Sequence, residues 1–498
     1  MKKFKFGKIT ALLLSGTMLF SATACAGTSK ADLVLMEEGV AYELTEKGTP
    51  VAYDSHTFSI TGGPDVMPIG GFHGPYKSGG SLNGNDLPNM LDEKYVAALS
   101  EAGINVIVYM GTRQEWASKD IEEVLKLGDK YGMGFYLNLL YLEQIIGSRN
   151  PAPIGNINKQ ELYNRIVNAC YGFKYESMLG FQLIDELFPT NQLKNAIKVA
   201  DTIREFGLPI DLYSNAHGYF AGNSFNWFGL SNYTYDEYVE EFKEMQLKVF
   251  SNTLYPYETA NGPSDDDTRS TLQELFSALR NARETAYNNG MAFWRMMAAG
   301  HQWAGMVESL PYAPSEGEFM FDANASLLFG AKGLQFYTCM QYPGEGTLPD
   351  GSYDSHRNGL IGVNGSKTQW WHYLKKLTNQ IFAADHILMN SASMGFIPYG
   401  EEAEALCKGI QGSSVLLEEF RQLDSISGDS CFVGCFDYKG GSAYMAMNAS
   451  RNNRAEVTLS FDGNYGYDVI QRGVQTSVVG TTMSLMLQPG EAVVIALR

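Results

Sequence analysis

The sequence lacks the marks of a metal-binding or nucleotide-binding protein. Its 498 residues contain six cysteines, scattered and without a CxxC pair, so neither a zinc site nor a disulfide framework is indicated. No GxGxxG or P-loop motif follows an apolar segment, which argues against a nucleotide-binding fold. After residue 24 no uncharged apolar run reaches the length of a transmembrane helix. We therefore expect a protein without a metal or a cofactor.

Positive charge is also scarce. The chain has 37 Lys and Arg against 55 Asp and Glu, which gives a formal charge of -18. Removal of residues 1–24, which contain four lysines and no acids, would make this charge -22. Such an acidic chain does not favour nucleic acid or anionic lipid as a partner, whereas neutral ligands suit it.

The first residues have the composition of an export signal. A basic segment with four lysines precedes the apolar run 9–20, which is too short to span a bilayer. Small residues then surround Cys25, and this segment resembles the lipobox of bacterial lipoproteins, with Ala22 where that family prefers Leu. The resemblance implies cleavage before Cys25, a lipid anchor on its thiol, and a place on the outer face of the cell membrane. An ordinary signal peptide cut near Ala24 is the alternative.

From about residue 64 the sequence alternates between short apolar strands and amphipathic helices. The predicted strands are 67–73, 105–110, 134–140, 178–185, 209–215, 247–254, 292–296 and 334–339. The predicted helices are 91–103, 121–131, 159–169, 191–206, 235–245, 264–289, 318–329 and 370–381. Eight strand–helix pairs in one run favour a closed parallel (β/α)8 barrel over an open doubly wound sheet.

The pattern changes after about residue 390. Short alternating segments separated by Gly, Asn and Asp turns are typical of antiparallel strands. They lie at 432–436, 442–448, 455–461, 467–470 and 492–496. We predict a signal peptide at 1–24, a linker with N-terminal strands at 25–63, the barrel at 64–391 and a small antiparallel β-sandwich domain at 392–498.

Candidate binding residues follow the predicted strands, because barrel enzymes carry their reacting groups at the C-terminal strand ends. Carboxylates, amides and aromatic rings dominate these positions, and such side chains suit a neutral, hydroxyl-rich ligand. Loop hydrogen bonding for the histidines and core packing for the aromatic residues are the alternatives. The predicted substrate-binding residues are His73, Glu143, Asn215, His217, Tyr255, Tyr257, Gln302 and Trp303.

The end of the fourth predicted strand carries two consecutive acids, Asp185 and Glu186. Alternation along a strand places Glu186 on one face with Gln182 and Asp185 on the other. The segment resembles the strand-four motif of the clan of barrel glycosidases that includes bacterial β-galactosidases and cellulases, in which an acid/base Glu follows an Asn. Here Asp185 replaces that Asn, and Leu187 stands where an Asp-Glu-Pro variant has Pro. The resemblance implies that Glu186 is a catalytic acid/base, with Asp185 as a further candidate; charging or capping of the next helix is the alternative.

A second segment, 319–337, resembles the passage from helix seven to strand eight of the same glycosidases. The turn 362–365 before Trp370 and Trp371 resembles their entry into helix eight. With the strand-four motif, the similarity covers roughly residues 64–391, and the C-terminal segment looks like the small β-domain that follows such barrels. These motifs concern architecture more than activity.

One feature of that clan is missing. Its nucleophile is a Glu at the end of strand seven, whereas residues 293–298 contain no acid and the next carboxylate is Glu308. Glu308 is therefore the candidate nucleophile, with Glu143 or Glu258 as the base of an inverting scheme as alternatives. We expect a surface glycoside hydrolase acting on an extracellular oligosaccharide or polysaccharide. A carbohydrate-binding lipoprotein without catalytic activity is the alternative.

Overall fold

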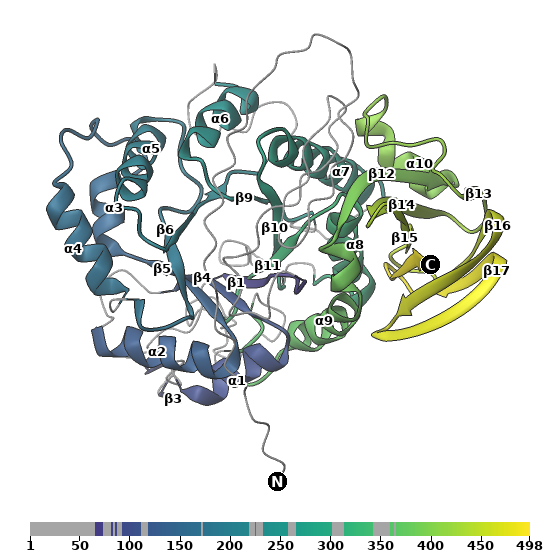
Figure 1. Cartoon of the computed structure of the whole chain (residues 1–498), viewed down its shortest axis with the longest axis horizontal. Coiled ribbons are helices and arrows are strands. Elements are labelled where there is room, and N and C mark those ends of the chain that lie inside the picture. Colours follow the sequence, from purple (N-terminus) through teal and green to yellow (C-terminus); the bar gives the residue numbers. More distant parts are fainter. Residues whose placement is uncertain are drawn as a thin grey trace, which may run out of the picture.

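Parallel strands form a closed barrel at the centre of the larger part of the molecule (Figure 1). The computed structural model describes residues 65–72, 81–82, 85–86, 92–110, 118–170, 173–218, 225, 233–256, 265–300, 313–341, 359–362 and 365–498. The barrel strands are β1 (Ile69–Phe72), β4 (Val106–Met110), β5 (Gly134–Asn138), β6 (Met178–Gln182), β7 (Asp211–Tyr213), β8 (Asn215–Ala216), β9 (Val249–Thr253), β10 (Ala292–Ala298) and β11 (Gly333–Tyr337). A short hairpin of β2 (Ser81–Leu82) and β3 (Asn85–Asp86) lies outside this sheet.

The barrel closes at a break in its fifth strand. β7 pairs with β6 and β8 pairs with β9, and Ser214 alone separates β7 from β8. The two pieces thus form one interrupted strand, and the sheet has the eight positions that the sequence predicts. This finding confirms the (β/α)8 barrel.

Helices surround the barrel (Figure 1). They are α1 (Glu93–Glu101), α2 (Ser118–Tyr131), α3 (Leu140–Ile146), α4 (Lys159–Ala169), α5 (Asn191–Arg204), α6 (Tyr235–Phe242), α7 (Asp265–Asn288), α8 (Glu316–Leu328) and α9 (Gln369–Leu388). Thr190 caps α5 as predicted, and capping boxes begin α6 at Thr234 and α8 at Ser315. Helix α3 was not predicted: β5 ends at Asn138, and the apolar residues that follow it form a helical turn instead of extending the strand.

The C-terminal part is an antiparallel sheet of seven strands, in agreement with the predicted β-sandwich. Its strands are β12 (Ser391–Tyr399), β13 (Leu423–Gly428), β14 (Cys431–Tyr438), β15 (Gly441–Asn448), β16 (Ala455–Gln471), β17 (Val474–Leu487) and β18 (Ala492–Leu497), with the short helix α10 (Glu401–Leu406) after β12. On β14, Phe432 packs on Phe276 of α7, whereas Val433 belongs to a separate core with β16 and β17. The central strands are therefore buried on both faces.

The junction between the barrel and this sheet contains two buried basic side chains. Arg283 of α7 donates to the carbonyl oxygen of Phe329 at 2.9 Å and to Ser393 Oγ at 2.7 Å. Lys332 Nζ donates to the carbonyl oxygens of Leu388 and Ser391. Because β12 begins at Ser391, these bonds tie its first residues to the barrel.

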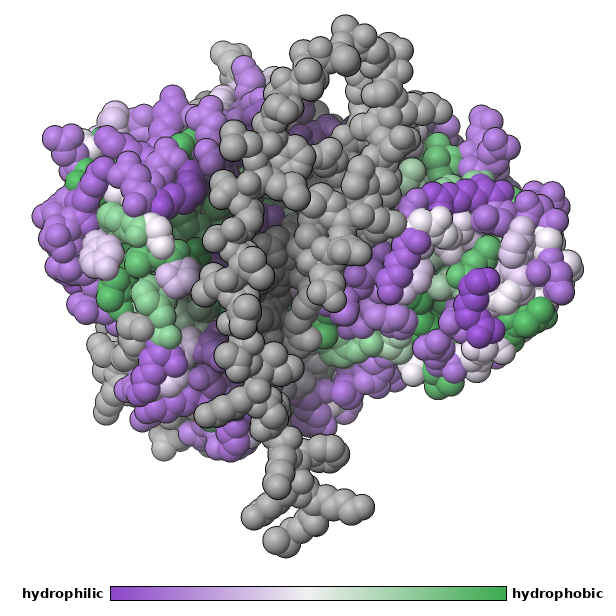
Figure 2. Space-filling model, viewed as in Figure 1, coloured by the Kyte–Doolittle hydropathy of each residue, from purple (hydrophilic) through white to green (hydrophobic). Residues whose placement is uncertain are grey.

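The outer surface of the C-terminal sheet is mixed in character. Strand β17 exposes Val474, Val478, Val479 and Met486, and hydrophobic and hydrophilic residues lie side by side on this part of the molecule (Figure 2). The five cysteines that the structure describes are buried and free. Within the described ranges, no helix combines the length and apolar character needed to cross a membrane.

Candidate active site

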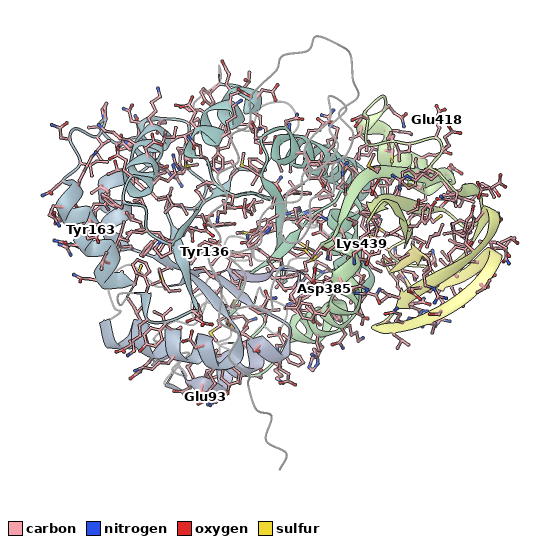
Figure 3. The ribbon with its side chains drawn as sticks, in the orientation of Figure 1. Glu93, Tyr136, Tyr163, Asp385, Glu418 and Lys439 are labelled. Carbon is pink, nitrogen blue, oxygen red and sulfur yellow. The ribbon has the colours of Figure 1, made fainter. Side chains whose placement is uncertain are left out.

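Aromatic and amide side chains fill the interior of the barrel. Gln335 Nε2 on β11 donates to Tyr213 Oη on β7 at 2.7 Å, so both side chains point inward from distant strands. The Tyr213 ring lies 5.5 Å from the ring of Tyr136, which Figure 3 shows in the middle of the barrel. A Cβ at Gly70 would lie 2.6 Å from Gln335 Cγ, so glycine leaves room for this amide. The interior is a packed core, and a ligand must bind above it, at the C-terminal strand ends.

The turn after β6 is hydrogen-bonded to Ser214 and Asn215, at the break in strand five. β6 ends at Gln182, three residues earlier than predicted, and Glu186 adopts a left-handed backbone with φ of 48°. The Glu186 N–H donates to the carbonyl oxygen of Asn215 at 3.0 Å, and Ser214 Oγ donates to that of Ile184 at 2.5 Å. A non-glycine residue in this conformation is disfavoured, so the surrounding contacts must hold it there.

Glu186 faces a neutral histidine. Its Oε2 lies 3.8 Å from His217 Nδ1, and the carboxyl side chain keeps 40% of its surface exposed while the imidazole keeps 7%. Burial lowers the pKa of His217 to about 4, so the ring carries no charge at neutral pH. Burial also raises the pKa of Glu186, although the Thr253 hydroxyl partly opposes this shift. Because burial is the dominant effect, the carboxyl keeps its proton to a higher pH than an exposed glutamate.

Asp185 lies on the same side as its neighbour. Burial and the charge of Glu186 raise the pKa of Asp185 well above its usual range, and the Asn215 amide partly opposes this shift. The alternation rule placed Asp185 on the opposite face, and that expectation is wrong because the strand ends before the turn. Since Asn215 Nδ2 also donates to Thr253 Oγ1, both carboxyls lie against one hydrogen-bonded pair at the barrel mouth.

Asn215 and His217 are near the acids but are engaged by the protein. Asn215 Oδ1 accepts from Ser251 Oγ at 2.9 Å, and Asn215 is fully buried. The His217 ring packs edge-on against Phe188 and Phe225, with centroids 5.3 and 5.8 Å away. Their geometry is that of residues that position the two carboxyls.

The other described candidates lie at neighbouring strand ends. Glu143, in the first turn of α3, accepts from Asn138 Nδ2 at 2.7 Å. The Tyr255 ring lies 6.2 Å from that of Tyr337, at the end of β11. The remaining predicted residues fall outside the described ranges: His73, Tyr257, Glu258, Gln302, Trp303, Glu308 and Cys25.

Sequence reasoning missed Thr253 and did not select Gln182 as a site residue. Thr253 is the last residue of β9 and contacts both Asn215 and Glu186. Gln182 is the last residue of β6 and is fully buried. A polar residue that ends an apolar strand was the available signal in both cases. In the described part of the chain, no three His, Cys, Asp or Glu side chains gather in a way that could hold a metal ion.

Solved structures similar to this one are barrel glycoside hydrolases. A GH42 β-galactosidase from G. stearothermophilus is 9% identical over 87% of this chain and 98% of that enzyme, with a TM-score of 0.53. A GH27 β-L-arabinopyranosidase from Geobacillus stearothermophilus is 10% identical over 89% of this chain and 98% of its own, with a TM-score of 0.48. A β-galactosidase from Marinomonas ef1 is 11% identical over 64% of this chain, which spans 60% of that enzyme, with a TM-score of 0.43.

Neither a protein-family model nor a curated protein sequence matches the chain. At these identities, the similarity to the GH42 β-galactosidase shows that the fold is shared. It agrees with the predicted glycosidase-type barrel. The activity has to be argued from the site.

Proposed function

We propose that this protein is a glycoside hydrolase in which Glu186 is the general acid. The observation that carries the proposal is the position of Glu186 at the barrel mouth, with a burial-raised pKa and a neutral imidazole 3.8 Å away. A general acid must be protonated before reaction, and both features favour the protonated carboxyl. Its 40% exposure leaves the carboxyl accessible to a substrate.

The reaction follows from this placement. Glu186 donates its proton to the glycosidic oxygen, the C1–O bond breaks with its electron pair on the departing alcohol, and water supplies the hydroxyl that C1 gains. His217 limits the orientations available to the carboxyl. The Glu186 N–H bond to Asn215 fixes the backbone, so that the carboxyl does not turn away from the mouth.

Glu186→Gln tests the proposal, because the amide keeps the shape of the side chain and cannot donate an acidic proton. With a panel of aryl glycosides, we expect kcat to fall about 10²- to 10⁴-fold. The fall in kcat should be smallest for substrates whose leaving group has a low pKa, since such a group needs little protonation. Asp201→Asn, at an exposed position on α5, is the matched control. Unchanged turnover in the Glu186 variant would remove this residue from the mechanism.

A second candidate function is carbohydrate binding without cleavage. The observation that favours it is the absence of any Asp or Glu between Glu284 and Glu308, a segment that includes all of β10. A glycan array combined with product analysis separates the two functions. Binding by the wild type without release of product would favour the binder.

We also propose that the protein is attached to the outer face of the cell membrane by lipid on Cys25. The lipobox-like segment supports this placement. Cys25→Ser should prevent metabolic labelling with a fatty acid and release the protein into the medium. Continued labelling of that variant would contradict the proposal.

A further inference from the structure

Glu186 by itself does not complete a glycosidase site. A retaining enzyme needs a second carboxyl about 5–5.5 Å away as nucleophile, and an inverting enzyme needs one about 6.5–9.5 Å away as base. Strand β10 ends at Ala298 without an acid, and Glu143 is bonded to Asn138. Among the carboxyls that the structure describes, the one that adjoins Glu186 is that of Asp185, the preceding residue.

Asp185 has an unmet need for a hydrogen-bond donor. Its Oδ1 is buried and accepts no hydrogen bond from the residues that the structure describes. Buried polar atoms are nearly always paired, so an unpaired carboxyl oxygen at a barrel mouth points to a donor that a ligand supplies. Within the same described ranges, the fully buried amide of Gln182 has no partner for either polar atom.

Gln182 faces the barrel interior. It is in register with Tyr213 on β7, and the Tyr213 hydroxyl accepts a hydrogen bond from Gln335 across the barrel. Neighbours in register on parallel strands point to the same face of the sheet. Two unsatisfied groups therefore lie on one strand and its turn, one inside the barrel and one at its mouth.

An acetamido group on the substrate would supply two things that the described site lacks, a hydrogen-bond donor for Asp185 and a nucleophile. Its N–H is the donor that Asp185 Oδ1 lacks, and its carbonyl oxygen is a nucleophile that β10 does not provide. We propose that the protein hydrolyses 2-acetamido-2-deoxy glycosides with assistance from the substrate, with Asp185 binding the acetamido N–H and Glu186 acting as acid and base. This inference rests on the proposed glycosidase function and adds its substrate class.

The two steps balance without an external reagent other than water. Glu186 gives its proton to the glycosidic oxygen, the C1–O bond breaks with its electron pair on the departing alcohol, and the acetamido oxygen bonds to C1 to form an oxazolinium ion. Water then adds to C1 and gives its proton to Glu186, and the C1–O bond of the oxazolinium ring returns its electron pair to the amide. The configuration at C1 is retained, and the starting group must be trans to the acetamido group.

The proximity of the two carboxyls favours a protonated Glu186, which the first step needs. Burial raises the pKa of both, and the charge of Glu186 raises that of Asp185 further, so the pair binds a proton more readily than two exposed acids. A donated N–H bond favours the ionised form of Asp185. Substrate binding therefore favours the ionised form of Asp185 and the protonated form of Glu186, and the Asp185 carboxylate balances the charge of the oxazolinium ion.

A series of 4-nitrophenyl β-glycosides tests the proposal: the 2-acetamido glucoside and galactoside, their 2-hydroxy counterparts, and the 2-acetamido compounds with one, two or three fluorines on the acetyl methyl group. We expect cleavage of the acetamido substrates and a steep fall in kcat with each fluorine, because fluorine weakens the carbonyl nucleophile. Asp185→Asn should lower kcat for the acetamido substrates about 10²-fold, and Asp201→Asn should not.

The outcomes separate this inference from the proposed function. Cleavage of the 2-hydroxy glycosides that depends on Glu186, without cleavage of the acetamido compounds, would overturn the inference and leave the glycosidase function standing. A kcat that does not change with fluorine would also overturn it, because an enzyme carboxylate would then be the nucleophile. Failure to cleave any of the substrates would count against both.

Discussion

Charged and polar side chains are buried both at the barrel mouth and at the junction with the C-terminal sheet, with different partners. At the junction, Arg283 and Lys332 each donate to at least two acceptors. At the end of β6 and in the turn after it, Gln182 and Asp185 keep buried atoms that no described residue pairs with. Satisfied buried polar groups stabilise a fold, whereas unsatisfied ones cost stability that a ligand can restore. The two regions therefore differ in whether these buried side chains have hydrogen-bond partners.

Arg283→Met gives the largest expected effect on stability. Three acceptor contacts would be lost, with the carbonyl oxygens of Phe329 and Ser393 left in a buried environment. We expect the free energy of unfolding to fall by about 1–3 kcal/mol for each buried acceptor left unpaired. Urea unfolding measures this change. A loss below that of an exposed control such as Arg165→Met would mean that the junction is not the stabilising region.

The pH dependence of stability should reveal Lys332. Burial lowers its pKa to about 7 from 10.5, so between these values the unfolded chain holds one more proton than the folded protein. Stability should therefore rise with pH through this window, by at most about 1.4 kcal/mol per unit, and the full cost should be present below pH 7. Urea unfolding at pH 6.5 to 10 measures the slope. Lys332→Met should flatten it, and equal slopes in the two proteins would contradict the assignment.

Gln182→Met should raise the free energy of unfolding, whereas the Arg283 substitution should lower it. Methionine has a similar size and removes two unpaired polar atoms from the barrel interior, so we expect a gain of about 1 kcal/mol in the free energy of unfolding. Activity should fall if a ligand or its bound water uses the amide. A clear loss of stability would show that Gln182 already has a partner, and the end of β6 would then resemble the junction.

Glu186→Gly should change the free energy of unfolding no more than Gln182→Met does. Glycine adopts a φ of 48° without strain, so removal of the Glu side chain should stabilise the fold by about 1 kcal/mol while it abolishes catalysis. Thermal or urea unfolding against Glu186→Ala isolates the backbone contribution, since alanine keeps the strain. Equal stability of the two variants would show that the turn is not strained.

Much of the barrel could be predicted because its strands are apolar runs and its helices carry recognisable ends. Helix α4 begins and ends at the predicted residues, and Thr190 caps α5 as expected. The break in strand five at Ser214 could not be predicted. It depends on hydrogen bonds to two different neighbours, because β7 pairs with β6 and β8 pairs with β9. Helix α3 was missed because a short apolar run fits a strand and a helix equally well.

The candidate site was predicted only in part. The sequence places two acids after the fourth strand, and a resemblance suggested a role for Glu186. The sequence does not reveal that Asn215 contacts Asp185 and that Thr253 contacts Glu186. Asn215 and Thr253 come from other strands, which only barrel closure brings together.

By itself, the sequence determined the alternation of strands and helices in the barrel, the change to antiparallel strands after residue 390, and the two acids that follow β6, since these depend on local periodicity and composition. The tertiary structure decided which way Asp185 faces, why His217 is neutral, and which buried atoms lack partners. These properties depend on burial and on contacts between strands, which no stretch of sequence contains.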